Sequence, residues 1–321
     1  MAAVIGNDEA QAAFAAALNG DALHHAWLLA GPEGVGKGTF ARAAGASLVG
    51  GEAHRDALIA ARAHPDFRAI EREVWDKSSP PRIMAHEDRK GDEPLARSIR
   101  IAQIRTLMPM LTTRPSMSER RVVVIDAIDD LEPGGANALL KSLEEPPAGT
   151  IFLLVSHAPG RLLPTLRSRC RLLRFGLLSD ADVAAVLRRA DPAFSDEEVA
   201  ALVKAGEGSP GRALRFAGLD VQGLDSAITA IAADGDADNV RRSALARALA
   251  IKSAQPRYEA FLERAPAFLA RAARNRHGPA LAATLDAHAR ARDLAGSALG
   301  LSLDPQATVW EMAAVLAGLH R

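Results

Sequence analysis

The chain of 321 residues is long enough for two or three domains of ordinary size. It is 48% hydrophobic but only 4% aromatic, a composition that favours helices packed on helices or on a sheet. The formal net charge of +0 excludes a strong overall attraction to nucleic acid or to an anionic membrane, so any contact with DNA is expected to be local or shared with partners.

The first part of the chain alternates apolar runs with helical patterns. The run 27–30 stops at Gly31, as a buried parallel strand does. In chain order we expect a helix over 1–22, a strand over 27–30, a helix to 49, a strand over 68–74, a long polar loop over 76–97, and a helix over 99–111 capped by Ser98.

The alternation continues through the middle of the chain. Strands are expected over 122–126, 151–155 and 172–175, and a helix over 135–145 is stopped by two prolines. Strands that alternate with helices imply a parallel sheet with helices on both faces. The first domain is therefore predicted to be of the α/β class.

The remainder of the chain predicts helices and no convincing strand. We expect an α/β domain over 1–176, a small helical lid domain over 177–220 and an all-α C-terminal domain over 221–321. The last helix carries Trp310 and Met312 among apolar residues at helical spacing, which suits either an internal core or an interface.

A glycine-rich phosphate loop is predicted between the first strand and the next helix. Backbone N–H groups of the glycine turn and of the helix N-terminus can surround a phosphate, and a lysine can reach its outer oxygens. The loop residues are Gly31, Gly34, Gly36 and Lys37. The alternative is an ordinary strand-to-helix turn with an exposed lysine.

Two positions of this predicted nucleotide site lack the groups that magnesium-dependent hydrolysis needs. Gly38 stands where a Ser or Thr hydroxyl normally reaches the metal, and Thr39 would project roughly 100° away around the helix. Asp126 suits the acidic residue that orients magnesium, although a plain strand-end aspartate is the alternative. Ala127 follows, and its methyl group cannot position an attacking water.

Three segments carry a resemblance to a known family. The segment 137–147 reads NALLKSLEEPP, and 163–170 reads LPTLRSRC with a Ser-Arg-Cys motif. Together with the lead-in LHHAWLL over 23–29, they resemble the bacterial DNA polymerase III clamp-loader family of AAA+ proteins. The similarity covers about residues 1–218 and is only compositional beyond.

The damaged magnesium and water positions resemble the delta-prime subunits of that family. The resemblance implies a non-hydrolysing AAA+ scaffold that helps load the sliding clamp on primed DNA during DNA replication, with gamma/tau motor and delta subunits as partners. It implies no required cofactor and at most weak ATP or ADP binding. It also implies that Arg169, flanked by Ser168 and Cys170, is an arginine finger in trans at a neighbouring motor subunit's ATP site, with an ordinary salt bridge as the alternative.

Two departures from the family pattern concern zinc and nucleotide sensing. Many relatives carry a four-cysteine zinc module, but the only cysteine here is Cys170, and His54, His64 and His86 suit surface or turn positions better than a metal site. No zinc is therefore expected. Gly211 stands where active subunits carry a sensing arginine, and Arg212 is displaced by one position.

Two other functions fit parts of the sequence. An active clamp-loader ATPase subunit has the same fold, and Gly38 and Ala127 argue against it. A P-loop kinase acting on a small molecule is the second, and the long helical C-terminal domain does not suit it. No apolar run reaches the roughly 18 residues of a membrane span and no signal pattern opens the chain, so a cytoplasmic setting is expected.

Overall fold

The computed structural model describes residues 4–19, 23–73 and 95–320, and the chain divides into two compact units, 1–214 and 215–321. The first unit holds a five-stranded sheet in the order β2-β3-β4-β1-β5, with every pairing parallel. The strands are β1 (Ala26–Ala30), β2 (Phe67–Glu71), β3 (Arg121–Asp126), β4 (Thr150–Ser156) and β5 (Arg171–Arg174). The predicted α/β class is confirmed.

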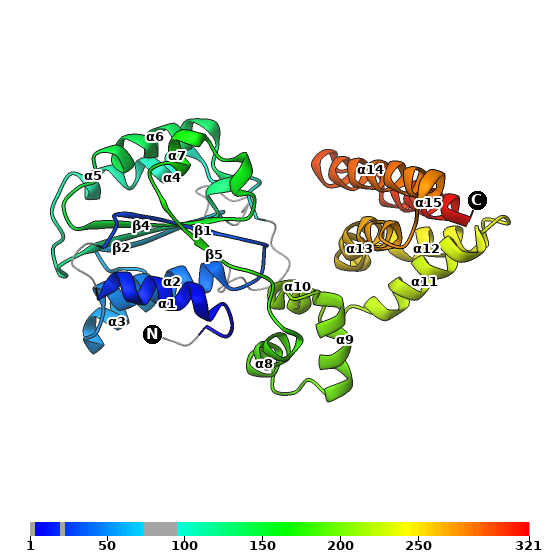
Figure 1. Ribbon diagram of the computed structural model, residues 1–321, viewed down its shortest axis with the longest axis horizontal. Helices are drawn as coiled ribbons and strands as arrows, with labels where there is room; N and C mark the ends of the chain where they lie inside the picture. Colours follow the sequence, from blue (N-terminus) through cyan, green and yellow to red (C-terminus); the bar gives the residue numbers. More distant parts are fainter. Residues whose placement is uncertain (1–3, 20–22, 74–94, 321) are drawn as a thin grey trace. The chain divides into compact units, whose positions relative to one another are not determined.

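Helices cover both faces of the sheet, as parallel strands require of their crossover connections (Figure 1). One face carries α1 (Asp8–Leu18), α2 (Lys37–Val49) and α3 (Ala53–Ala60). The other carries α4 (Ile101–Arg105), α5 (Met108–Leu111), α6 (Pro133–Glu144) and α7 (Pro164–Arg167). Short 3-10 turns η2 (Ile128–Asp130) and η3 (Pro159–Arg161) follow β3 and β4.

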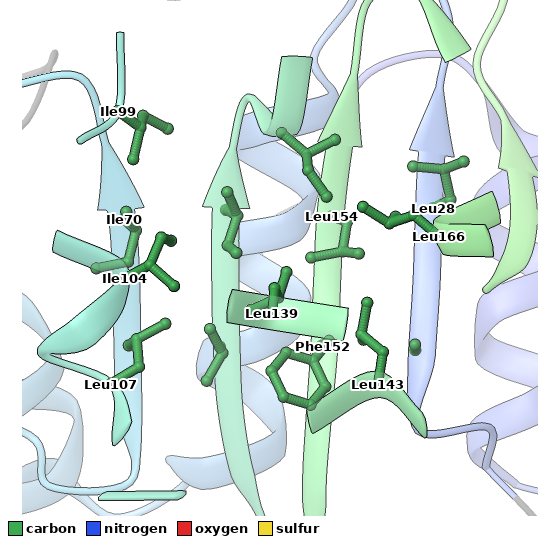
Figure 2. Packing of buried hydrophobic residues seen from close by; sticks show 14 of the residues in the cluster. Leu28, Ile70, Ile99, Ile104, Leu107, Leu139, Leu143, Phe152, Leu154 and Leu166 are labelled. Carbon is green, nitrogen blue, oxygen red and sulfur yellow. The ribbon is translucent and has the colours of Figure 1, made fainter. Parts of the chain in front are cut away.

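Alternate side chains of the central strands β1, β3 and β4 enter one of two apolar layers. Figure 2 shows the layer beneath α4 to α7, where Leu28, Phe152 and Leu154 of the sheet meet Leu139 and other leucines of the helices. On the opposite face Phe40 of α2 packs edge-on against Phe14, with ring centroids 5.5 Å apart. Phe14 belongs to α1 and packs in turn against Trp27 of β1, with ring centroids 5.1 Å apart. This cluster joins α2, and therefore the loop at its N-terminus, to the sheet through α1.

The structure corrects several predicted helix boundaries. The helix expected over 1–22 spans only Asp8–Leu18, because Gly6 and Asn7 have positive φ angles of 77° and 56° that interrupt a helix. The segment 99–111 forms two short helices, since Pro109 lacks the N–H that would continue α4. Arg100, not Ser98, is the N-cap residue of α4, and α3 was not predicted.

The strand expected over 68–74 spans Phe67–Glu71, and most of the loop expected over 76–97 lies outside the described residues. The lid segment of the first unit holds α8 (Asp180–Ala190), α9 (Asp196–Gly206) and α10 (Pro210–Arg215). Ser179 and Ser195 cap α8 and α9 by accepting hydrogen bonds from N–H groups of their first turns. The division of this unit at residue 176 stays a prediction.

The second unit is helical over its described residues. It holds α11 (Val221–Asp234), α12 (Val240–Leu249), α13 (Gln255–Ala273), α14 (Gly278–Leu301) and α15 (Pro305–Ala317), with the short turns η4 (Lys252–Ala254) and η5 (Gly318–His320). Met312 is fully buried, whereas Trp310 is 39% exposed beneath the Arg242 guanidinium. No helix in the described part of the chain is long and apolar enough to cross a membrane.

A buried ion pair ties the starts of β2 and β3 together. The Asp66 carboxylate accepts hydrogen bonds from the backbone N–H groups of Ser116, Met117 and Ser118, and it lies 3.4 Å from the Arg121 guanidinium. Burial alone would raise the pKa of Asp66, but the three N–H groups and Arg121 outweigh it, so the pKa is lowered.

Asp66→Asn is expected to lower the free energy of unfolding by about 3 kcal/mol, because it leaves the buried Arg121 charge without a counter-ion. A lowered pKa gives stability that is present above the unfolded value of about 3.9 and lost as pH falls through the folded value. Urea unfolding should therefore show that the difference in unfolding free energy between wild type and Asp66→Asn becomes smaller at acidic pH.

The control is Asp196→Asn, which breaks an exposed pair with Arg188 and should cost less than about 1 kcal/mol. Equal effects of the two variants at neutral pH would contradict this account of the Asp66 pair.

Candidate nucleotide site

The predicted phosphate loop connects the end of β1 to the start of α2. Lys37 is the first residue of α2, and Gly36 caps the helix with a φ of 95°, a conformation that favours glycine. The loop borders a cavity of about 590 Å³, within the range of ligand pockets. Because the first N–H groups of a helix have no partners within it, this end of the cavity can bind an anion.

Of the residues predicted to bind nucleotide, all but Gly31 line this cavity. They are Gly34, Gly36, Lys37, Gly38, Thr39 and Asp126. Gly31 lies behind the loop, where a Cβ atom would come within 2.0 Å of the Phe175 carbonyl oxygen. Its own carbonyl accepts a 2.8 Å hydrogen bond from the Lys37 ammonium group.

Lys37 is buried beneath the loop, with 2% of its surface exposed. Its ammonium group donates to the carbonyl oxygens of Gly31 and Pro32. Burial lowers the pKa of Lys37 to about 8, although the negative charge of Asp126 acts in the opposite direction. The lysine is therefore held at the loop by neutral acceptors and not by a carboxylate.

Asp126 occupies the space beside Gly38. A Cβ atom built at residue 38 would lie 2.0 Å from a carboxylate oxygen of Asp126. The same oxygen lies 3.2 Å from the Arg42 guanidinium of α2. Residue 38 thus supplies no hydroxyl, and the acidic residue is engaged by an arginine. The residues present do not fit a magnesium ion in its usual place.

Ala127 lines the cavity and offers no carboxylate that could position an attacking water. Asp130 also lines the cavity, but it lies 3.1 Å from Arg72, and burial raises its pKa against the influence of that arginine. Asp129 instead accepts hydrogen bonds from the Ser156 hydroxyl and from the Ala158 N–H at the end of β4. Neither Asp129 nor Asp130 therefore occupies the position from which residue 127 would act on an attacking water.

The lid segment is fastened directly to the phosphate loop. The Gly211 N–H donates to the Gly34 carbonyl oxygen at 2.9 Å, and the Ser209 hydroxyl donates to that of Glu33 at 2.8 Å. A Cβ atom at Gly211 would lie 2.7 Å from the Gly34 Cα atom, so a larger residue cannot enter without separating the two segments. Arg212 pairs with Glu207 at 3.1 Å and does not line the cavity.

Several cavity residues were not predicted. Arg42 and His157 line it, as does Arg189 of α8. His157 follows β4 at the same sheet edge as Asp126, a position that the parallel topology could have indicated. Burial and the nearby Lys37 lower the pKa of His157. Arg189 belongs to the lid segment, and no motif in the sequence around it indicated that it lines the cavity.

The Ser-Arg-Cys motif lies at the other edge of the sheet. The phosphate loop follows the last residue of β1, whereas the motif precedes Arg171, which pairs with Trp27 near the start of β1. At about 3.3 Å per residue, a strand of this length separates the two edges by roughly 16 Å. The structure thus brings together the predicted nucleotide residues but leaves Ser168, Arg169 and Cys170 apart from them.

At this edge Arg169 joins two of the motifs that carried the family resemblance. Its guanidinium lies 2.6 Å from the Glu144 carboxylate at the end of α6 and also donates to the Thr165 carbonyl oxygen. Cys170 faces inward, where burial raises the pKa of its thiol to about 12, while Ser168 is exposed. The salt bridge expected as the alternative for Arg169 is therefore present, on a partly exposed side chain.

Metal ligands are not grouped in the described residues 4–19, 23–73 and 95–320, where no three His, Cys, Asp or Glu side chains could together hold an ion. His64 is fully buried within its turn, and its ring accepts a hydrogen bond from the Asp66 N–H. His86 lies outside the described residues. The absence of zinc stays a prediction.

The strand order, the glycine loop after β1 and the acidic residue at the end of β3 define a P-loop protein of the AAA+ class with an incomplete magnesium site. Residues 6–179, more than half of the chain, match the family described as DNA polymerase III, delta subunit, and the chain belongs to that family.

Curated relatives come from several bacteria. DNA polymerase III subunit delta' of Pseudomonas aeruginosa is 35% identical over 64% of this chain and 60% of its own. The Escherichia coli subunit delta' is 32% identical over 54% of this chain and 46% of its own. DNA polymerase III subunit gamma of Buchnera aphidicola is 32% identical over 50% of this chain and 40% of its own. The matches thus span at most about three fifths of these relatives' length.

Two solved structures from Thermotoga maritima are also similar. A DNA polymerase III gamma subunit-related protein matches over 98% of this chain and 100% of its own, at 15% identity and a TM-score of 0.41. The RuvB Holliday junction branch migration motor matches over 71% of this chain and 64% of its own, at 19% identity and a TM-score of 0.41.

Gly211→Ala is expected to lower the free energy of unfolding by about 1 to 3 kcal/mol, the usual range for overpacking a close contact, although alanine is the better helix former. Thermal unfolding of the full chain measures the effect. Gly160→Ala is the control in the same unit, since nothing lies within 4 Å of its Cβ position. A Gly211→Ala protein as stable as the control would refute the close packing of lid and loop.

Proposed function

We propose that this chain is a clamp-loader subunit of the delta-prime type, which assists loading of a sliding clamp on primed DNA as a non-hydrolysing scaffold. In this role Arg169 acts in trans as an arginine finger at the ATP site of a neighbouring motor subunit. The observation that carries the proposal is the contrast between the two sheet edges. The edge with the phosphate loop lacks a magnesium site, whereas the opposite edge presents an arginine from the family motif.

The absence of hydrolysis follows from the chemistry of the missing groups. Phosphoryl transfer depends on a metal that neutralises charge between the phosphates and on a residue that orients the attacking water. Gly38 offers no metal ligand, Arg42 engages Asp126, and Ala127 offers no carboxylate. Gly38 and the Arg42–Asp126 pair remove the metal site, and Ala127 removes the group that orients water, so restoring one of these two functions would leave the other missing.

The purified chain is expected to release phosphate from ATP no faster than its Lys37→Ala variant, because neither metal nor water is positioned. A colorimetric phosphate assay with saturating Mg²⁺ measures the rate. The alternative is an active clamp-loader ATPase, and the similarity to gamma and gamma/tau subunits supports it, for example to that of Mycobacterium tuberculosis at 30% identity. A wild-type rate clearly above that of Lys37→Ala would favour this alternative.

The trans role of Arg169 is supported by its place and its chemistry. It lies beyond the reach of its own phosphate loop, at the far end of the strands. A guanidinium remains charged and offers a planar set of donors that fits the oxygens of a phosphate. The ion pair with Glu144 holds this group in one orientation without removing it from solvent, because both side chains stay partly exposed. An exposed pair of this kind is worth under about 1 kcal/mol, so a phosphate can displace it.

Arg169→Ala is expected to leave folding and assembly intact but to lower the ATPase rate of the adjoining motor subunit by about 10³-fold or more, the effect of arginine fingers in other nucleotide hydrolases. The measurement is clamp- and DNA-stimulated ATPase of the reconstituted complex. Arg167→Ala and Arg171→Ala are controls for a general loss of charge, and Arg167 is the cleaner one because Arg171 stacks on Trp27. Unchanged ATPase in every motor subunit would exclude the trans role.

We propose that assembly with gamma/tau and delta subunits depends on the second unit, 215–321. Its helices α11 to α15 enclose their own core, with Val309, Met312 and Leu316 of α15 buried. Trp310 remains partly exposed on the same helix. A helical unit with its own core can present a surface to neighbouring subunits without support from the α/β domain.

A further inference from the structure

We propose that the cavity of the first unit binds a nucleoside diphosphate without a divalent cation. Lys37 and the N-terminus of α2 hold the phosphates, and the Arg42–Asp126 ion pair replaces the metal site. This inference deepens the proposed non-hydrolysing role and rests on it, but it concerns binding by the isolated chain and requires no partner.

The first step is the charge of the acidic residues around the phosphate end. Asp126 lies 3.2 Å from the Arg42 guanidinium, and Glu71 lies 3.8 Å from the same group. Asp130 lies 3.1 Å from Arg72. In an ordinary P-loop site the strand-end carboxylate orients a hydrated magnesium ion. Here an arginine already lies beside each of these carboxylates and balances its negative charge. A divalent cation would therefore find little net attraction at this site.

The second step is the positive charge that remains for an anion. The Lys37 ammonium group bonds to neutral carbonyl oxygens, which do not cancel its charge. It stands at the N-terminus of the 13-residue helix α2, whose unpaired N–H groups point the same way. Lysine and helix terminus can together hold two adjacent phosphates. A third phosphate would bring more negative charge with no metal to balance it.

The third step is the apolar lining of the cavity, which suits a nucleoside base. Side chains from the N-terminal segment, the connection to the lid, and helices α8 and α10 form it. They are Val4, Ile5, Leu178, Val186, Pro210 and Leu214. Gly211 holds α10 against the phosphate loop, so the lid side chains of this apolar lining lie close to the residues that would bind phosphate.

The test is isothermal titration of the full chain with ADP and with ATP, each in Mg²⁺ buffer and in EDTA. The ADP dissociation constant is expected to differ by less than about threefold between the two buffers, and ADP is expected to bind at least as tightly as ATP. Arg42→Ala should weaken ADP binding in EDTA by about tenfold or more, because Asp126 then faces the phosphates unpaired. Mg²⁺ should restore part of that loss, since a freed carboxylate can attract a cation.

Arg188→Ala is the matched control, because it removes an exposed arginine of α8 that does not line the cavity. Thermal unfolding checks that each variant is folded. Binding of ADP that needs Mg²⁺, or no heat of ADP binding at millimolar concentration, would overturn this inference alone. Mg²⁺-dependent ATP binding accompanied by phosphate release would overturn both the inference and the proposed non-hydrolysing function.

Discussion

The salt bridge between Asp126 and Arg42 fills the corner of the site where a metal-binding hydroxyl would have to project. Residue 38 can only be small while the carboxylate stays there, because a Cβ atom would lie 2.0 Å from its oxygen. The glycine and the ion pair therefore form one arrangement and not two separate losses. Together with Ala127 they leave a cavity that keeps the N-terminus of α2 in its lining but lacks the groups of a metal site.

The parallel sheet makes this arrangement compatible with a second role at a distance. All strands run the same way, so the phosphate loop and Asp126 gather at the carboxyl edge while the Ser-Arg-Cys motif lies at the amino edge. Glu144 at the end of α6 holds Arg169 there, and the ring of His25 bonds to the Leu143 carbonyl oxygen. Changes in the nucleotide site thus leave the arginine edge intact, which is what the proposed scaffold requires.

The lid segment contributes rigidity rather than a sensing residue. Gly211 bonds to Gly34 and leaves no room for an arginine, while Arg212 turns to Glu207. Hydrogen bonds from Gly211 and Ser209 place the lid segment directly against the phosphate loop.

The five strands and most of the helices between them could be predicted from the sequence alone, because local periodicity carries them, although α3 was missed. Short motifs carry the phosphate loop and the residues at positions 38 and 127. Helix boundaries at Asn7 and Pro109 escaped prediction, since backbone conformation and a missing donor at single residues decide them. Only the tertiary structure decided that Arg42 engages Asp126 and that Glu144 holds Arg169. Both are contacts between residues far apart in the chain, and only the packing of α2 and α6 on the sheet brings their side chains within reach.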